Sequence, residues 1–259
     1  MSDQASQLRQ LVLRAARLRE TGALPPPRIA AVVSARRGMG TTTVAAQLGR
    51  ALVEQGARVV LVDADLNHAD LARASGVEVP VSYTASIARH DIHESLVRAP
   101  GGLQIVPGVW EGELETSLEK NAQQLLRQFQ QLGRHADLLV LDLGAAKPEV
   151  LRAWRDAIET FLVVTTPASA PVMDAYTLIK QSLVGRAGRG VELVVNRAID
   201  ARIAADVFQR LDRSCQRFLG FGIQLAGHLP PQGSADCLAT IAARLCEARS
   251  NHDSHRMAN

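Results

Sequence analysis

The residues with the clearest potential for chemistry form the run SARRGMGTTT, from Ser34 to Thr43. The run follows an apolar stretch, IAAVV, and precedes a stretch with a helical pattern. Gly38 and Gly40 allow the backbone to curl so that its N–H groups face inward. The N-terminus of the following helix also favours a bound anion. The run therefore has the layout of a phosphate-binding loop between a strand and a helix.

Two positions depart from the usual phosphate-loop pattern, G-x-x-x-x-G-K-[ST]. Ala35 stands where the first glycine would be, and Thr41 stands where a lysine would hold the terminal phosphates. Thr42 keeps the hydroxyl that binds Mg²⁺ in such loops. The pattern leaves three interpretations open: a working nucleotide site, a repaired one or a relic.

Polar side chains also end several apolar runs that read as strands. Asp63 and Asp65 end RVVLVDAD, Asp142 lies at the end of DLLVLD, and Asn196 ends VELVVN. Ligands of open parallel sheets bind beyond the carboxyl ends of the strands, so we expect these groups near the loop. Asp142 is suited to hold Mg²⁺ through its water shell. One of the other two acids could orient an attacking water and the other support the metal; alternatively, one of them is a helix cap or a turn residue.

Strand-like and helix-like runs alternate along most of the chain. The predicted strands are 29–33, 58–65, 103–108, 137–144, 160–165, 191–196 and 221–230, and the predicted helices are 42–55, 118–132, 172–184, 201–217 and 236–248. The strands are continuous apolar runs, which indicates burial on both faces. We therefore predict an α/β fold with a mostly parallel central sheet and helices on both faces.

An amphipathic helix is predicted ahead of this domain. Its apolar residues recur at steps of three and four, and four arginines lie on the remaining surface. Three prolines follow it and form a stiff spacer. We divide the chain into a helix (1–22), a linker (23–28), a domain (29–248) and a flexible tail (249–259). The helix either docks on its own domain or serves as an arm for a partner.

The composition limits the classes of partner. The 259 residues carry a formal net charge of +3, and only 3% are aromatic, so we predict no nucleic-acid partner. The three cysteines show no metal-binding spacing, which favours a reducing compartment. We expect a cytoplasmic protein with weak or absent membrane association, because CLATIAARLCEARS lacks the lysines and aromatic anchors of an interfacial helix.

Several motifs together resemble the MinD/ParA family of deviant P-loop ATPases. The family loop KGGVGKTT corresponds to RRGMGTTT, the motif LLDADLGLAN to VLVDADLNHAD, and the strand LVVDTAAG to LVLDLGAA. Within this family the chain is similar to the FlhG branch of flagellar number and placement regulators. That branch also shares the segments MDAYTLIK and RFLGFGIQLAGHLP and the N-terminal pattern DQAxxLR. The resemblance covers most of the chain.

The resemblance implies a set of functional residues. Family members bind ATP and Mg²⁺, dimerise face to face and hydrolyse ATP slowly. The implied roles are cofactor binding for Arg37, Gly38, Met39, Gly40, Thr41, Thr42 and Thr43, adenine contact for Asn196, metal binding for Thr42 and Asp142, catalysis for Asp63, Asp65 and Arg36, and partner activation for Asp3, Gln4, Leu8 and Arg9. The implied partners are an FlhF-like GTPase of the signal-recognition-particle type and C-ring proteins of the flagellar basal body. The implied location is cytoplasmic, with peripheral attachment at the inner membrane near the flagellar base as an alternative.

The departures from the family loop lead us to expect impaired or absent hydrolysis. Thr41 replaces the phosphate-binding lysine, Arg36 replaces the lysine that crosses to the partner subunit, and Arg37 takes a glycine position. Weak binding through the backbone N–H groups is expected to survive. The alternatives are a nucleotide-independent scaffold on the same fold, a ParA-type partitioning ATPase and a bacterial tyrosine kinase. The last would need a tyrosine-rich tail, but the chain has only Tyr83 and Tyr176.

Overall fold

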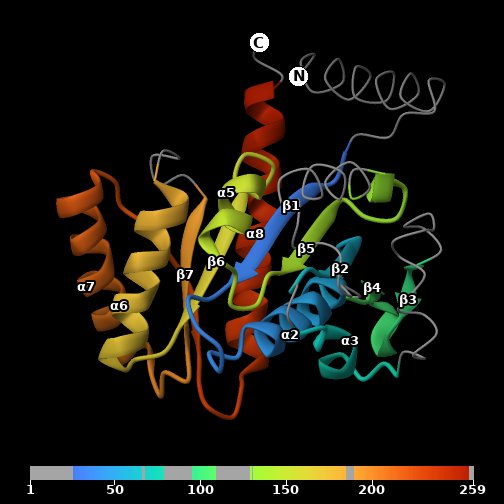
Figure 1. Cartoon of the computed structure of the whole chain (residues 1–259). Helices are drawn as coiled ribbons and strands as arrows, with labels where there is room; N and C mark the ends of the chain where they lie inside the picture. The colour runs from blue at the N-terminus through green and yellow to red at the C-terminus, as the bar shows by residue number, and fades with distance from the viewer. Residues whose placement is uncertain are drawn as a thin grey trace, which may run out of the picture.

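A twisted, mostly parallel sheet forms the middle of the molecule (Figure 1). The computed structural model describes residues 26–65, 68–78, 95–108, 129, 131–184 and 190–256. The eight strands are β1 (Arg28–Val33), β2 (Val59–Asp63), β3 (Val97–Arg98), β4 (Gln104–Val106), β5 (Leu138–Asp142), β6 (Thr160–Thr165), β7 (Val191–Asn196) and β8 (Gln224–Leu229). Their order is β3-β4-β2-β5-β1-β6-β7-β8, and every pairing is parallel apart from that of β3 with β4.

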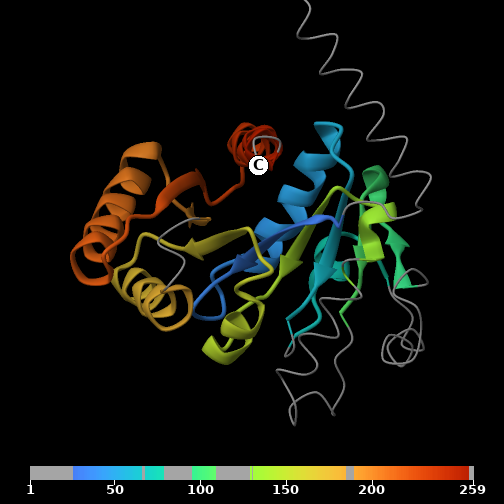
Figure 2. The same ribbon diagram turned by 90° about the horizontal axis from the view of Figure 1, so that it is seen from above.

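Helices cover both faces of this sheet (Figure 2). The α-helices are α2 (Thr41–Glu54), α3 (Leu71–Ala74), α5 (Pro148–Trp154), α6 (Ser169–Leu178), α7 (Ala201–Leu219) and α8 (Ala235–Arg256). The shorter elements are the 3₁₀-helices η3 (Pro100–Gly102) and η5 (Leu132–Arg134) and the π-helix η6 (Ile179–Leu183). Helices α2 and α8 pack on one face, and α5, α6 and α7 pack on the other. The predicted fold class is therefore confirmed.

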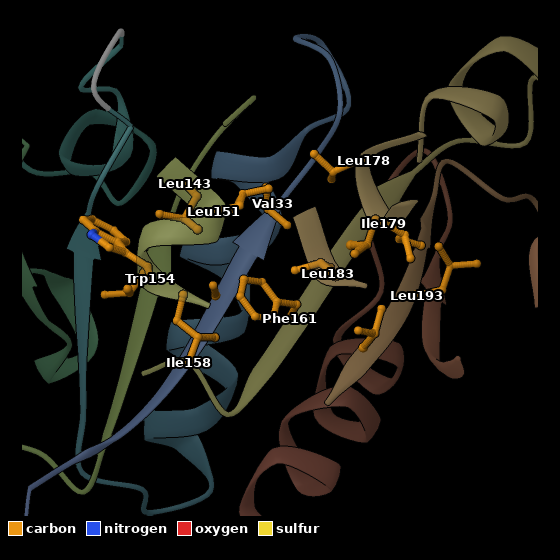
Figure 3. Packing of buried hydrophobic residues seen from close by; sticks show 14 of the residues in the cluster. Val33, Leu143, Leu151, Trp154, Ile158, Phe161, Leu178, Ile179, Leu183 and Leu193 are labelled. Atoms are coloured by element: carbon orange, nitrogen blue, oxygen red, sulfur yellow. The ribbon is translucent and has the colours of Figure 1, made fainter. Parts of the chain in front are cut away.

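Strand β1 shows why the strands are apolar along their whole length. Ile29, Ala31 and Val33 point into the cluster under α5 and α6, whereas Ala30 and Val32 point into the cluster under α2 and α8. Figure 3 shows the first cluster, in which side chains from the α5 region and from η6 lie around the ring of Phe161. Because successive side chains of a strand alternate between the two faces, two helical layers require an uninterrupted apolar sequence.

Helix α8 packs on the domain, as the sequence indicated for this segment. Leu238, Ile241, Ala242 and Leu245 are buried in the cluster that α8 shares with α2. The helix extends to Arg256, past the predicted end of the domain at residue 248. Within the described ranges, no helix has both the length and the hydropathy needed to cross a membrane.

Several short elements were not predicted from the sequence. Helix α5 has seven residues, α3 has four and β3 has two, so none is long enough to show a clear periodicity. The predicted helix 1–22, with Asp3, Gln4, Leu8 and Arg9, lies outside the described residues, and so does most of the predicted helix 118–132.

Candidate nucleotide site

The loop between β1 and α2 has the curl that its glycines predict. Gly38 has a φ of 80° and Gly40 a φ of 82°, values in the left-handed region that other residues rarely adopt. A Cβ atom on Gly40 would also lie 2.4 Å from Nδ2 of Asn196. Helix α2 begins at Thr41, directly after Gly40. Gly40 is therefore required both for its backbone conformation and for the close approach of Asn196.

Thr41, which stands in the lysine position, forms a hydrogen bond between the two ends of the loop. Its hydroxyl donates a hydrogen bond to Oγ of Ser34 at 2.8 Å. The hydroxyl of Ser34 in turn faces the carbonyl oxygens of Arg36, at 2.9 Å, and Gly144, at 3.3 Å. Both hydroxyl side chains are buried. Thr41 thus joins the start of α2 to the ends of β1 and β5.

A cavity of about 180 Å³ opens in front of the loop. It is bordered by the loop itself, by the segment after β2 and by the segment after β5. The lining residues are Ser34, Arg37, Gly38, Gly40, Thr41, Thr42, Thr43, Asp65, His68, Asp70, Gly144 and Ala145. Seven of the predicted site residues are among them. Ser34, His68, Asp70, Gly144 and Ala145 were missed, although each follows a predicted strand closely and its position there was the available signal.

Asp142, the last residue of β5, is buried next to Thr42, which borders this cavity. Burial raises the pKa of Asp142 to about 6, while the nearby hydroxyl of Thr42 and the N–H of Gly144 act to lower it. The N–H of Gly144 donates to Oδ1 at 3.1 Å. The other oxygen, Oδ2, is buried without a partner in hydrogen-bonding geometry. A buried carboxylate oxygen with no partner is unfavourable unless a cation or a proton joins it.

The pair of Thr42 and Asp142 fits a Mg²⁺ ion bound together with phosphate and water. Mg²⁺ takes few protein ligands and keeps several water or phosphate oxygens. The residues that the structure describes contain no group of three or more acidic, histidine or cysteine side chains that could hold a metal. The hydroxyl of Thr42 and Oδ2 of Asp142 are the protein oxygens that could hold such an ion.

The two aspartates after β2 have different surroundings. Asp65 borders the cavity, and its Oδ1 accepts the N–H of His68 at 3.2 Å. Asp63 is buried and does not border the cavity. Its Oδ2 accepts the N–H of Leu71, the first residue of α3, at 3.0 Å. This geometry favours the structural alternative for Asp63, whereas the catalytic role of Asp65 stays a prediction.

The two arginines of the loop also point to different places. Arg37 borders the cavity. Nε of Arg36 lies 2.6 Å from a carboxylate oxygen of Asp174 on α6, and both side chains are partly exposed. Arg37 is therefore the loop cation positioned to meet a ligand within this chain, and Arg36 is held against the neighbouring helix.

Asn196 contacts the loop from outside the cavity lining. Its Nδ2 donates to the carbonyl oxygen of Met39 at 2.8 Å, and its Oδ1 accepts the N–H of Arg197 at 3.0 Å. The side chain of Met39 packs beside the cluster under α2. The predicted adenine contact of Asn196 stays a prediction.

Residues 28–227 match the family model described as cellulose biosynthesis protein BcsQ. The chain belongs to this MinD/ParA-type family. The resemblance noted from the loop and strand motifs is thereby confirmed.

Two related sequences are named for a role in regulation or in flagellum placement. The antiactivator FleN of Pseudomonas aeruginosa is 27% identical over 82% of this chain and 77% of its own. The flagellum site-determining protein YlxH of Helicobacter pylori is 28% identical over 58% of this chain and 52% of its own.

A solved member of the family shares the fold. The septum site-determining protein MinD of Pyrococcus horikoshii, complexed with Mg-ADP, superposes with a TM-score of 0.63. The match covers 85% of this chain and 96% of that chain at 21% identity. At this identity the likeness concerns the arrangement of strands and helices.

The raised pKa of Asp63 predicts how the free energy of unfolding changes with pH. Burial raises its pKa from 3.8 to about 7, against the lowering effect of the bond from Leu71. Between pH 4 and pH 7 the unfolded chain releases this proton before the folded chain does, so the free energy of unfolding should fall as the pH rises. We expect Asp63→Asn to weaken this fall, because the amide oxygen still accepts from Leu71 but carries no charge. Urea unfolding across this pH range measures the effect.

Asp156→Asn is the matched control for this measurement. The side chain of Asp156 is 87% exposed, so its removal should leave the pH dependence of the wild type unchanged. Parallel curves for Asp63→Asn and the wild type would contradict the assignment of the raised pKa to Asp63.

Proposed function

We propose that this chain is a regulator of flagellar assembly, number or placement that acts through protein partners. We further propose that it binds Mg-ATP weakly and hydrolyses it slowly or not at all. The relatives named antiactivator FleN and flagellum site-determining protein YlxH support the regulatory role. The observation that carries the nucleotide part is the buried, unpartnered Oδ2 of Asp142 beside Thr42 and the curled loop.

In this proposal the protein contributes three kinds of contact. The N–H groups of the loop and of the first turn of α2 bind phosphate oxygens. Thr42 and Asp142 would hold Mg²⁺, which neutralises phosphate charge when it is bound. Arg37 supplies a positive side chain at the cavity. The hydroxyl of Thr41 donates to Ser34 and carries no charge. Thr41 therefore does not replace the missing lysine.

The missing lysine is the reason for the low activity that we propose. No lysine is among the cavity-lining residues in the described part of the chain. A donor that meets developing charge contributes about 2–4 kcal/mol, by analogy with an oxyanion-hole donor, or roughly 10²–10³ in rate. Arg37 offsets part of this loss at most, because a guanidinium does not reproduce the reach and geometry of a lysine.

A titration with fluorescent ATP tests the nucleotide site. We expect saturable binding that strengthens when Mg²⁺ is present. The Mg²⁺-dependent part should decrease below about pH 6, where a proton competes for Asp142. Asp142→Asn should abolish that Mg²⁺-dependent gain and leave the Mg²⁺-independent part. Absence of saturable binding at millimolar Mg-ATP would remove the nucleotide from the proposal.

The second candidate is a scaffold that keeps the fold without the switch, and the bonding of Thr41 to Ser34 favours it. Thr41→Lys distinguishes the two. If the rest of the site is intact, the new ammonium group should raise ATP turnover by about 10²–10³. Thr41→Met is the matched control, because it also loses the hydroxyl but brings no charge. Equal turnover in both variants would favour the scaffold.

We also propose the division of the chain into an activating helix (1–22), a linker (23–28), the domain and the tail (249–259). The helix is proposed to stimulate an FlhF-like GTPase through Asp3, Gln4, Leu8 and Arg9, while the domain engages C-ring proteins. The chain is also proposed to form a homodimer when ATP is bound. The motif DQASQLR, at residues 3–9, supports the proposed activating role of the helix.

The arm is tested by following GTP turnover of the FlhF-like GTPase. We expect the full chain and a peptide of residues 1–22 to accelerate turnover, because the motif is confined to this helix. Gln4→Ala should lose the effect and Gln10→Ala should retain it. If the peptide gives no stimulation, the helix is a docking element only.

A further inference from the structure

The carboxamide of Asn196 links two distant stretches of main chain. Its Nδ2 donates to the carbonyl of Met39 at 2.8 Å, and its Oδ1 accepts the N–H of Arg197 at 3.0 Å. The two bonds fix which end of the amide faces the loop, since only the NH₂ group donates and only the oxygen accepts. Both ends of the amide are therefore occupied by the protein itself.

The bond to Met39 also determines where the next N–H group points. In a planar trans peptide, the carbonyl of one residue and the N–H of the following residue point in opposite directions. Holding the carbonyl of Met39 against Asn196 therefore directs the N–H of Gly40 away from Asn196. Gly40 borders the cavity, whereas Asn196 does not. This N–H group thus points away from Asn196 and belongs to a residue that lines the cavity.

The segment behind this contact is built rigidly. Arg197 has a φ of 60°, which is uncommon for a residue other than glycine. The N–H of Ala198 is bonded to the carbonyl of Leu229 at the end of β8, at 3.0 Å. A residue held in the left-handed region costs about 1–3 kcal/mol and persists where its surroundings require it. The left-handed backbone of Arg197 thus lies between the N–H that holds the oxygen of Asn196 and the bond of Ala198 to Leu229.

We propose that Asn196 is a positioning residue for the phosphate loop. It holds the Met39–Gly40 peptide so that the N–H of Gly40 stays available to a phosphate oxygen. The proposal rests on the nucleotide binding proposed above and differs from the adenine contact that the family resemblance implies. A loop without its lysine depends more on fixed N–H groups. Asn196 therefore acts on the phosphate part of the ligand, whatever base is attached.

A ligand with a base and a ligand without one, both with three phosphates, distinguish a positioning role of Asn196 from an adenine contact. Asn196→Asp has nearly the same shape but turns an oxygen toward the carbonyl of Met39. Binding of Mg-ATP and of Mg-tripolyphosphate, which has no base, is measured by calorimetry for the wild type and the variant. We expect both affinities to fall by a similar factor of about ten or more, the loss of one hydrogen bond with an acceptor left unpaired. A loss confined to ATP would overturn the proposal in favour of an adenine contact.

Hydrogen–deuterium exchange of the full chain without ligand gives the second measurement. Asn196→Ala should speed exchange in the peptide that covers Gly38 to Thr43. The matched control is Asp200→Ala, which removes the bond from the N–H of Ile203, at 2.8 Å, on the same connection without touching the loop. Unchanged exchange in Asn196→Ala would overturn the positioning role. If the wild type binds neither ligand but exchange accelerates, the proposed nucleotide binding fails and the positioning of the loop stands.

Discussion

The turn between β1 and α2 depends on hydrogen bonds to the carboxyl ends of other strands of the sheet. Ser34 and Thr41 tie its root to the carbonyl of Gly144 after β5, and Asn196, the last residue of β7, holds its far side. Two glycines in the left-handed region allow the backbone to close between these points. The positions of the cavity, of Arg37 and of Thr42 all follow from this turn, because each is attached to it or faces it.

Burial sets the electrostatics of the site. Asp63 and Asp142 end adjacent strands within the sheet and are almost completely enclosed, so their pKa values are raised to about 7 and about 6. The cost of an ionised buried carboxylate falls when a cation binds. Oδ2 of Asp142 has no partner in hydrogen-bonding geometry, whereas Oδ2 of Asp63 accepts the N–H of Leu71 at the start of α3 and its Oδ1 accepts the N–H of Asp65. Two similar acids on neighbouring strands therefore have different surroundings.

The site keeps the backbone conformation of a phosphate-binding loop but lacks the positive charge of its lysine. The curl and Thr42 border one cavity, and the carboxylate of Asp142 is buried beside Thr42. The residue in the lysine position, however, is turned into the protein by its bond to Ser34, and Arg36 is paired with Asp174. This combination agrees with a weak nucleotide switch and also with a scaffold, which differ in whether the ligand still binds.

The sequence by itself determined the fold class, the boundaries of most long elements and the identity of the loop, because continuous apolar runs, glycine pairs and helix periods are local signals. It also predicted that Asp65 and the loop residues gather at one edge, since parallel strands end on the same side. It could not separate Asp63 from Asp65, or Arg36 from Arg37, because neighbours in sequence differ only in what the fold places beside them. The inward bond of Thr41, the ion pair of Arg36 with Asp174 and the hold of Asn196 on Met39 were decided by the tertiary structure, because each joins segments far apart in the chain or depends on the curl that the fold imposes.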